Sequence, residues 1–275
     1  MKHSLPFIAV LMFTASSFAQ SPFGVMPYGC PGLEIDKYAV LDEAKYKFSY
    51  KLTCVVDTVE NTTITNNLIL LVGPKYSKFF NVYPPQPKVK RNPHADGVST
   101  EESRGLGATE VYKDLKKKKM VVTTRVWIPS TDIFTYEEEL PTQKWKILSD
   151  KKTIYGYNCR KATTTYLGRN YEAWFTNEIP LHNGPWKLGG LPGMILEAND
   201  MQRHFVFECI GIEKLKEKEE IVQYKWHYVK KTRKDVNNMI RRMHEDFFSY
   251  LATVSNGRYG GGHSKPQPYN PLERE

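Results

Sequence analysis

From Lys45 the chain alternates polar and apolar side chains through Cys54, and this period of two is typical of a β-strand with one solvated face. The apolar positions of the series are Tyr46, Phe48, Tyr50, Leu52, Cys54 and Val56. Similar short runs follow at residues 65–72, 78–83, 120–127 and 133–137, bounded by Gly, Pro or Asn. Such a succession of strands predicts an antiparallel sheet.

Two hairpins are predicted further along. Residues 158–166 return through 171–176, and Gly168 and Asn170 supply the positive φ angles that the turn needs. A second hairpin joins residues 194–198 to 204–212. Both place consecutive strands side by side in one sheet.

A helical stripe follows the last strand. Apolar residues recur at intervals of four and three, with a capping-box pattern at Thr232 and Asp235 and a stop signal at Asn256 and Gly257. The stripe consists of Val236, Ile240, Met243, Phe247, Leu251 and Val254. We predict an α+β protein, mainly antiparallel β: a curved sheet or open half-barrel packed against one long C-terminal helix, residues 233–254. A loose tail is expected after about residue 258.

The N-terminus has the pattern of a secretory signal peptide. Lys2 precedes an apolar run at residues 5–13, and Ser17 and Ala19 place small residues where signal peptidase cleaves. We therefore predict a signal peptide over residues 1–19 and a single domain over 20–275. The apolar run is too short to span a bilayer, so the protein is expected to be periplasmic, outer-membrane-associated or secreted, with no membrane span after signal removal.

Composition limits the partners. The 39 Lys and Arg residues exceed the 30 acids, giving a formal net charge of +9, but bases and acids are mixed along the chain. A nucleic-acid platform needs aromatic side chains interleaved with bases on one face, so no nucleic-acid partner is expected.

Four cysteines are disulfide candidates in an oxidising compartment: Cys30, Cys54, Cys159 and Cys209. Because no two of them form a C-x-x-C pair, a structural zinc site is not expected. If the hairpin strands lie in sequence order, Cys159 and Cys209 are three strands apart, about 14 Å, which disfavours a bond between them.

Residues 178–195 read EIPLHNGPWKLGGLPGMI, and this density of Gly and Pro excludes a helix or a central strand. Gly190, Pro192 and Gly193 are interpreted as structural loop residues, with Pro192 and Gly193 at the centre of a type II turn. The segment is either a structural lid over the sheet or a binding site. In the second case the ligand-binding candidates are Trp174, Trp186, Leu191 and Met194.

At these residues the sequence resembles the GLPGLI family of exported proteins of Gram-negative envelopes. The hexapeptide stands here as residues 190–195, with Met194 where the family usually has Leu. The resemblance extends over nearly the whole chain, through residues 156–162, 173–176, 178–180, 184–185 and 270–273. It implies an envelope protein, and it carries no assigned catalytic residues or activity.

Catalytic motifs are absent from the sequence: it contains no H-E-x-x-H, no G-x-S-x-G and no phosphate-binding glycine loop. Glu178, Glu197 and Asp200 flank the Gly/Pro segment as carboxylates for glycoside chemistry, and His204, His227 and His244 are the histidines that a fold could gather. Acids that cap turns and pair with Lys187 or Arg203 explain the first set more simply, and histidines at the surface or satisfied in the core explain the second. No catalytic residue, metal or cofactor is therefore assigned.

Three functions remain open. The first is a non-enzymatic binding or accessory protein whose concave sheet face holds an apolar or peptide ligand. The second is a hydrolase of envelope polymers or peptides. The third is an interaction module of an outer-membrane transport system.

Overall fold

The computed structural model describes residues 37–81, 109–124, 133–257 and 262–274. The strands are β1 (Tyr38–Asp57), β2 (Thr62–Val72), β3 (Tyr76–Asn81), β4 (Thr109–Asp114), β5 (Lys119–Thr124), β6 (Ile133–Glu139), β7 (Lys146–Ile154), β8 (Tyr157–Tyr166), β9 (Arg169–Thr176), β10 (Met194–Asp200), β11 (Phe205–Tyr224) and β12 (Tyr228–Lys230). The helices are α1 (Arg233–Glu245) and α2 (Phe247–Val254).

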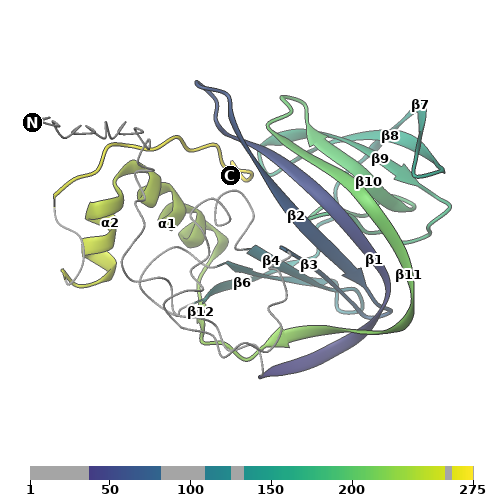
Figure 1. Cartoon of the computed structure of the whole chain (residues 1–275), viewed down its shortest axis with the longest axis horizontal. Coiled ribbons are helices and arrows are strands. Elements are labelled where there is room, and N and C mark those ends of the chain that lie inside the picture. The colour runs from purple at the N-terminus through teal and green to yellow at the C-terminus, as the bar shows by residue number, and fades with distance from the viewer. Residues whose placement is uncertain (1–36, 82–108, 125–132, 258–261, 275) are drawn as a thin grey trace, which may run out of the picture.

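All twelve strands of the described residues belong to one open sheet in the order β12-β6-β5-β4-β3-β2-β1-β11-β10-β9-β8-β7. Every neighbouring pair is antiparallel except β12 and β6. The two 20-residue strands β1 and β11 pair near the middle of the sheet, and register shifts after Val40, Ala44 and Ser49 break their ladder. Such bulges bend a strand pair, which is consistent with the strong curvature of the sheet in Figure 1.

The sheet has a core face and an outer face, and two adjacent rows of paired residues distinguish them. One row joins Leu52, Phe207, Ala198, Ala173 and Ala162 across five strands, and all five are buried. The next row, shifted by one residue, joins Lys51, Glu208, Glu197, Trp174 and Lys161. Because neighbouring residues of a strand point to opposite faces, the second row lies on the outer face.

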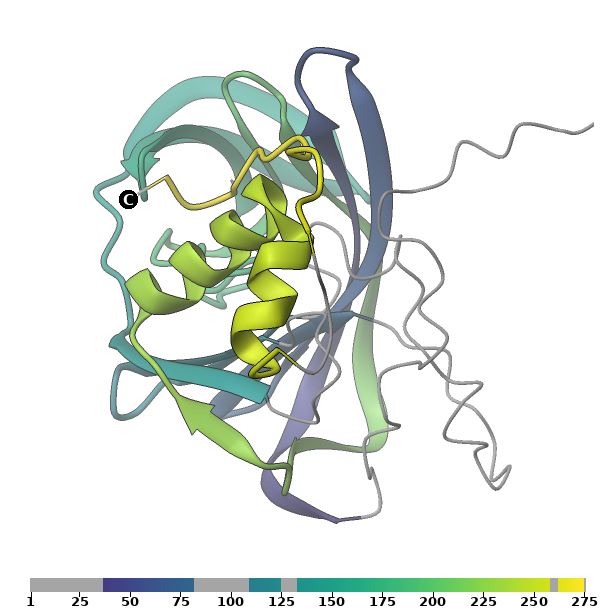
Figure 2. The same cartoon turned by 90° about the vertical axis from the view of Figure 1, so that its left-hand side faces the viewer.

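The predicted fold class is wrong. The sheet dominates the structure, and the expected long helix is two short helices that break at Asp246. Asp246 is extended, with φ −156° and ψ 94°, and its side chain accepts a hydrogen bond from Ser249 N at 3.1 Å as the N-cap of α2. Asp favours such caps over helix interiors, and the four-residue interval from Met243 to Phe247 conceals the break in the sequence. Figure 2 shows both helices in front of the open end of the curved sheet.

The predicted hairpins are confirmed. β8 and β9 are joined by Leu167 (φ 47°) and Gly168 (φ 73°), a two-residue turn whose positive angles match the twist of the strands. The turn is shorter than predicted, because Arg169 already pairs with Tyr166. β10 and β11 pair antiparallel as expected.

The signal peptide (1–19), Cys30 and the Pro-rich stretch 84–107 lie outside the described residues. Within the described ranges, none of the helices has the length and apolar character needed to traverse a bilayer.

Candidate functional site

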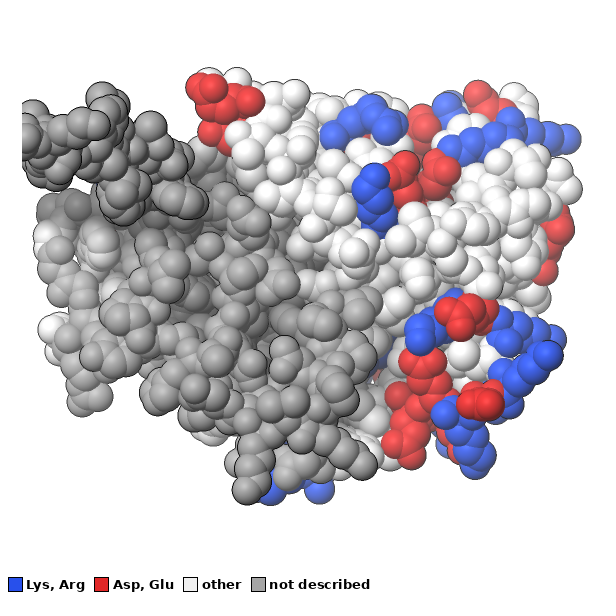
Figure 3. Space-filling view, viewed as in Figure 1, with Lys and Arg blue, Asp and Glu red and all other residues white. Residues whose placement is uncertain are grey.

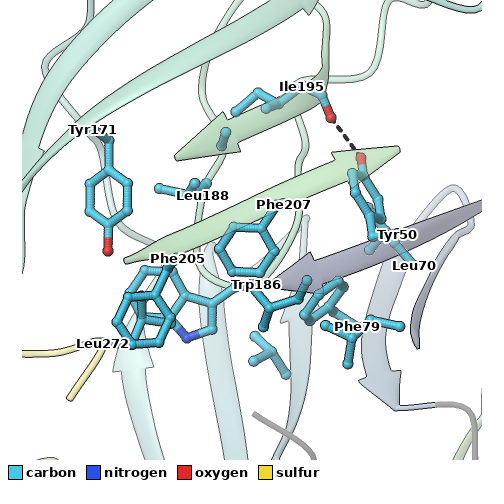
Figure 4. Close-up of a cluster of buried hydrophobic side chains, with 14 of the residues drawn as sticks. Tyr50, Leu70, Phe79, Tyr171, Trp186, Leu188, Ile195, Phe205, Phe207 and Leu272 are labelled. Atoms are coloured by element: carbon cyan, nitrogen blue, oxygen red, sulfur yellow. Dashed lines mark hydrogen bonds between the residues drawn. The ribbon is translucent and has the colours of Figure 1, made fainter. Parts of the chain in front are cut away.

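Residues 177–193 cross the concave face of the sheet and connect its two halves. On one side Trp186 packs on Tyr166 and Tyr171, with ring centroids 5.8 and 6.3 Å away. On the other side Lys113 of β4 binds the backbone of the loop. Figure 4 shows Trp186 gathered with Phe205, Phe207 and Leu272, all buried. The chain itself therefore fills the concavity that the sequence suggested for an apolar ligand.

The loop turns more tightly at Pro192 than a type II turn. Gly193 N donates to Leu191 O at 2.7 Å, which closes a three-residue turn around Pro192. Gly193 has φ +155°, whereas a type II turn needs about +80° at this position. The reason is tertiary: the α-carbon of Gly193 lies against the Thr176 carbonyl, where a side chain does not fit.

Lys113 is a buried cation that, among the residues the structure describes, has no carboxylate as a hydrogen-bond partner. Its Nζ donates to Asn183 Oδ1 (2.8 Å), Leu188 O (2.8 Å) and Gly184 O (3.2 Å), so each ammonium proton has an acceptor on the loop. The residue is only 3% exposed, and burial lowers the pKa of Lys113 to about 7. The loop is thus fastened to β4 by a group that titrates near neutral pH.

Lys113 should make stability depend on pH. Its pKa is about 7 in the folded protein and 10.5 as the ordinary value, so between these limits the unfolded chain binds more protons. The free energy of unfolding contributed by this residue therefore rises with pH, by up to about 1.4 kcal/mol per unit. We expect the difference in unfolding free energy between the wild type and Lys113→Met, measured in urea, to increase from pH 7 to pH 9. A constant difference over that range would contradict this assignment.

A second buried cation, Lys187, lies within the loop itself. Its Nζ contacts Glu138 at 2.9 Å and Glu273 at 2.8 Å, and Tyr136 Oη at 3.1 Å. Arg233, at the start of α1, pairs with the same two carboxylates. This ion network joins the loop, β6, α1 and the C-terminal segment.

The third buried cation, Arg169, holds the C-terminal segment. It pairs with Asp200 at 2.7 Å, and both side chains are at most 2% exposed. Its remaining donors reach Asn270 Oδ1 (2.6 Å) and the carbonyls of Pro271 (2.5 and 3.1 Å) and Leu272 (3.2 Å). Whereas the sequence predicts a loose tail after about residue 258, residues 270–273 are bound to the sheet and Leu272 is 7% exposed.

The four predicted ligand-binding residues do not meet at one surface. Trp186, Leu191 and Met194 are at most 1% exposed and belong to the main core. Gly190 and Pro192 lie in the same loop. Trp174 belongs to the same core cluster but lies in the outer row of β9, where its side chain is 9% exposed.

Trp174 is the centre of a polar row on the outer face. The ammonium groups of Lys152 and Lys161 lie 4.5 and 5.1 Å from its ring centroid, and its Nε1 donates to Glu172 Oε1 at 3.2 Å. Lys161 also pairs with Glu172 at 3.1 Å, and Lys152 pairs with Glu197. Lysines and carboxylates thus alternate around one indole ring.

The row continues across the sheet. Glu197 lies directly opposite Glu208, and this like-charged pair is compensated from both sides, by Lys152 and by Lys51 at 3.6 Å. From Asn67 on β2 to Lys161 on β8 the row spans six strands, about 24 Å at 4.8 Å per strand. Figure 3 shows the same mixing of signs on the face in view, where Lys and Arg are interspersed with Asp and Glu.

The carboxylates named as hydrolase candidates each have a protein partner. Glu178 accepts from Asn158 N at 2.9 Å and from Asn158 Nδ2 at 3.1 Å, Glu197 pairs with Lys152, and Asp200 pairs with Arg169. The histidines do not form a metal site. Within the ranges that the structure describes, no group of three His, Cys, Asp or Glu side chains is placed to hold a metal ion. His204 lies just before β11, His227 just before β12 and His244 on α1.

The cysteines in the described ranges, Cys54, Cys159 and Cys209, are buried, and no disulfide joins any two of them. Burial raises the pKa of Cys54 to about 12 and the pKa values of Cys159 and Cys209 to about 11. Such thiols are poor nucleophiles at neutral pH.

The polar residues that matter here were missed from the sequence. Lys113 lies two residues after Val111 on β4, and Arg169 lies two residues before Tyr171 on β9. Each charged residue thus stands where the period of two predicts a buried side chain, and this was the signal available in the sequence. Lys152 and Lys161 carry no such signal, since lysines on a solvated strand face are common.

The class defined by these observations is an open, curved antiparallel sheet whose concave face is filled by its own loop, helices and C-terminal segment. Residues 106–238, just under half of the chain, match the family described as the N-glycanase peptide N-terminal domain. No curated protein matches the chain.

Among solved structures, the chain is similar to PNGF-II in two crystal forms. One has a TM-score of 0.50 at 17% identity and covers 73% of this chain and 34% of that chain. The other has a TM-score of 0.49 at 17% identity, with 74% and 33% covered. The chain thus spans about a third of the length of PNGF-II, and at this identity the first match shows a shared fold.

Proposed function

We propose that this chain is a non-enzymatic accessory protein that binds a neutral carbohydrate chain on the outer face of its sheet, along the row centred on Trp174. The observation that carries the proposal is the setting of that ring. The Trp174 side chain is 9% exposed, with the ammonium groups of Lys152 and Lys161 close to its ring. Where a sugar displaces these lysines, the indole offers an apolar surface for the C–H face of the sugar, and the charged groups around it offer strong hydrogen bonds to hydroxyls.

The charges of the row favour a neutral ligand. Lys51, Lys152 and Lys161 are matched by three carboxylates, Glu172, Glu197 and Glu208. The carboxylates would repel a polyanion, and the lysines would repel a polycation. The length of the row suits an extended chain rather than a single small molecule.

The comparisons support a glycan in this role, because the matching family is the N-terminal domain of an N-glycanase. Membership of the GLPGLI family, removal of residues 1–19 and location in the envelope are parts of the same proposal. They rest on the sequence motif at residues 190–195 and on the signal-peptide pattern.

Replacing Trp174 should weaken glycan binding. With the neutral core oligosaccharide of N-linked glycans as probe, we expect Trp174→Leu to reduce affinity at least about tenfold in calorimetric titration, because the stacking surface is lost. Lys152→Ala should reduce it by a smaller factor through the loss of a charged donor.

The matched control is Lys218→Ala, which removes an 80% exposed lysine paired with Glu43 at the other end of β11. It should leave affinity unchanged. Equal affinity of the Trp174→Leu variant and the wild type, or no binding by the wild type to any neutral oligosaccharide of the panel, would refute the proposal.

A further inference from the structure

The C-terminal segment lies on the sheet in the manner of a bound peptide. Residues 270–274 belong to neither a helix nor a strand, yet Arg169 donates hydrogen bonds to two of their carbonyls and Arg274 N donates to Leu167 O at 3.0 Å. Contacts to peptide backbone give affinity that depends little on sequence, as in other modes of extended-peptide recognition.

Side chains add selectivity at three positions. Leu272 is 7% exposed and belongs to the main core cluster with Phe205 and Trp186. Glu273 pairs with the buried ammonium of Lys187 at 2.8 Å. Asn270 donates through Nδ2 to Val55 O at 2.7 Å, while its Oδ1 accepts from Arg169.

The groove is built independently of the segment that it holds. Arg169 is fixed by Asp200, whose other carboxylate oxygen accepts from Phe205 N at 2.8 Å, and the guanidinium lies 4.6 Å from the Phe205 ring centroid. Lys187 is fixed by Glu138 and Tyr136. Pro271 limits the conformations of the segment, which lowers the entropy lost on docking.

We propose that this groove is a peptide-binding site, occupied in the free protein by the chain's own residues 270–273. The partner that it fits is an extended segment of another protein in which a leucine, preceded by proline, is followed by a carboxylate. This site is distinct from the Trp174 row, so failure of one proposal would leave the other untouched.

The test uses the full chain cut once, at a protease site introduced directly after Gly257, so that the segment stays bound without being covalently joined. A fluorescent peptide of residues 262–275 is then added, and its anisotropy reports exchange. We expect saturable 1:1 binding to the cut protein. The uncut protein should bind the peptide far more weakly, because its tethered segment competes at an effective concentration near the millimolar range.

Changes in the peptide leave the protein untouched, so they separate recognition from folding. A Leu272→Ala peptide should bind about 30-fold more weakly through the lost burial, and a Glu273→Gln peptide about tenfold more weakly. The matched control is Arg274→Ala, an exposed position, which should change affinity less than about threefold.

Two results would overturn the proposal. One is a scrambled 270–273 peptide that binds the cut protein as well as the native sequence does. The other is unfolding of the cut protein, seen by circular dichroism, that added peptide does not reverse, because the segment would then be part of the fold rather than its ligand.

Discussion

Arg169→Met should lower the free energy of unfolding by about 3–5 kcal/mol, the loss typical of leaving one charge of a buried ion pair without its partner. Asp200 is 2% exposed, and among the described residues its carboxylate would keep the hydrogen bond from Phe205 N but no charged partner. The variant also loses four hydrogen bonds to residues 270–272. Urea denaturation followed by circular dichroism measures the effect.

The Arg169→Met/Asp200→Asn double variant should recover part of this loss, because no uncompensated charge stays buried. Arg241→Met is the control: Arg241 forms an exposed pair with Glu245 on α1, and pairs of this kind contribute little. A single Arg169 variant as stable as the Arg241 variant would show that the pair does not hold the C-terminal segment as described.

Gly193→Ala should be the most damaging small substitution in the loop. A Cβ at this position would lie 2.0 Å from Thr176 O and 2.6 Å from Thr176 C, and φ is +155°. Backbone atoms of β9 cannot withdraw without breaking the ladder, so we expect a loss of at least about 3 kcal/mol of unfolding free energy.

Gly190→Ala provides the matched comparison in the same hexapeptide. Gly190 also has a positive φ, +81°, but within the described part of the chain no atom beyond its two sequence neighbours lies within 4 Å of the added carbon. Only the conformational penalty of about 1 kcal/mol should appear. Equal losses for the two variants would contradict the close contact between the loop and Thr176.

The sequence predicted those structural elements that depend on contacts between residues close together in the chain. The β8–β9 hairpin was found because Gly168 tolerates the required angle, and the buried series from Phe48 to Cys54 because strand periodicity marks one face. The helix was predicted as one element because the apolar stripe runs unbroken past Asp246, whose capping role depends on contacts with Ser249 and Ser264.

Distant contacts were not predictable in this way. Lys113 donates to acceptors on a loop about 70 residues away, and Arg169 donates to Pro271 about 100 residues away. No spacing in the sequence predicts either contact. The loop at residues 177–193 was correctly seen as irregular. Its place inside the concave face follows from Lys113 and Lys187. Because the loop fills that face, we place the candidate ligand surface on the opposite face, with Trp174 at its centre.

The most direct test of this account is the response of the tryptophan side chains to a bound glycan. The chain has five Trp residues, and each indole N–H gives a separate signal in a nitrogen–proton correlation spectrum. On titration with the neutral N-linked core oligosaccharide, the Trp174 signal, assigned by comparison with Trp174→Leu, should shift progressively while that of buried Trp186 stays in place. A shift of Trp186 with Trp174 unmoved would place the ligand on the concave face and contradict the account.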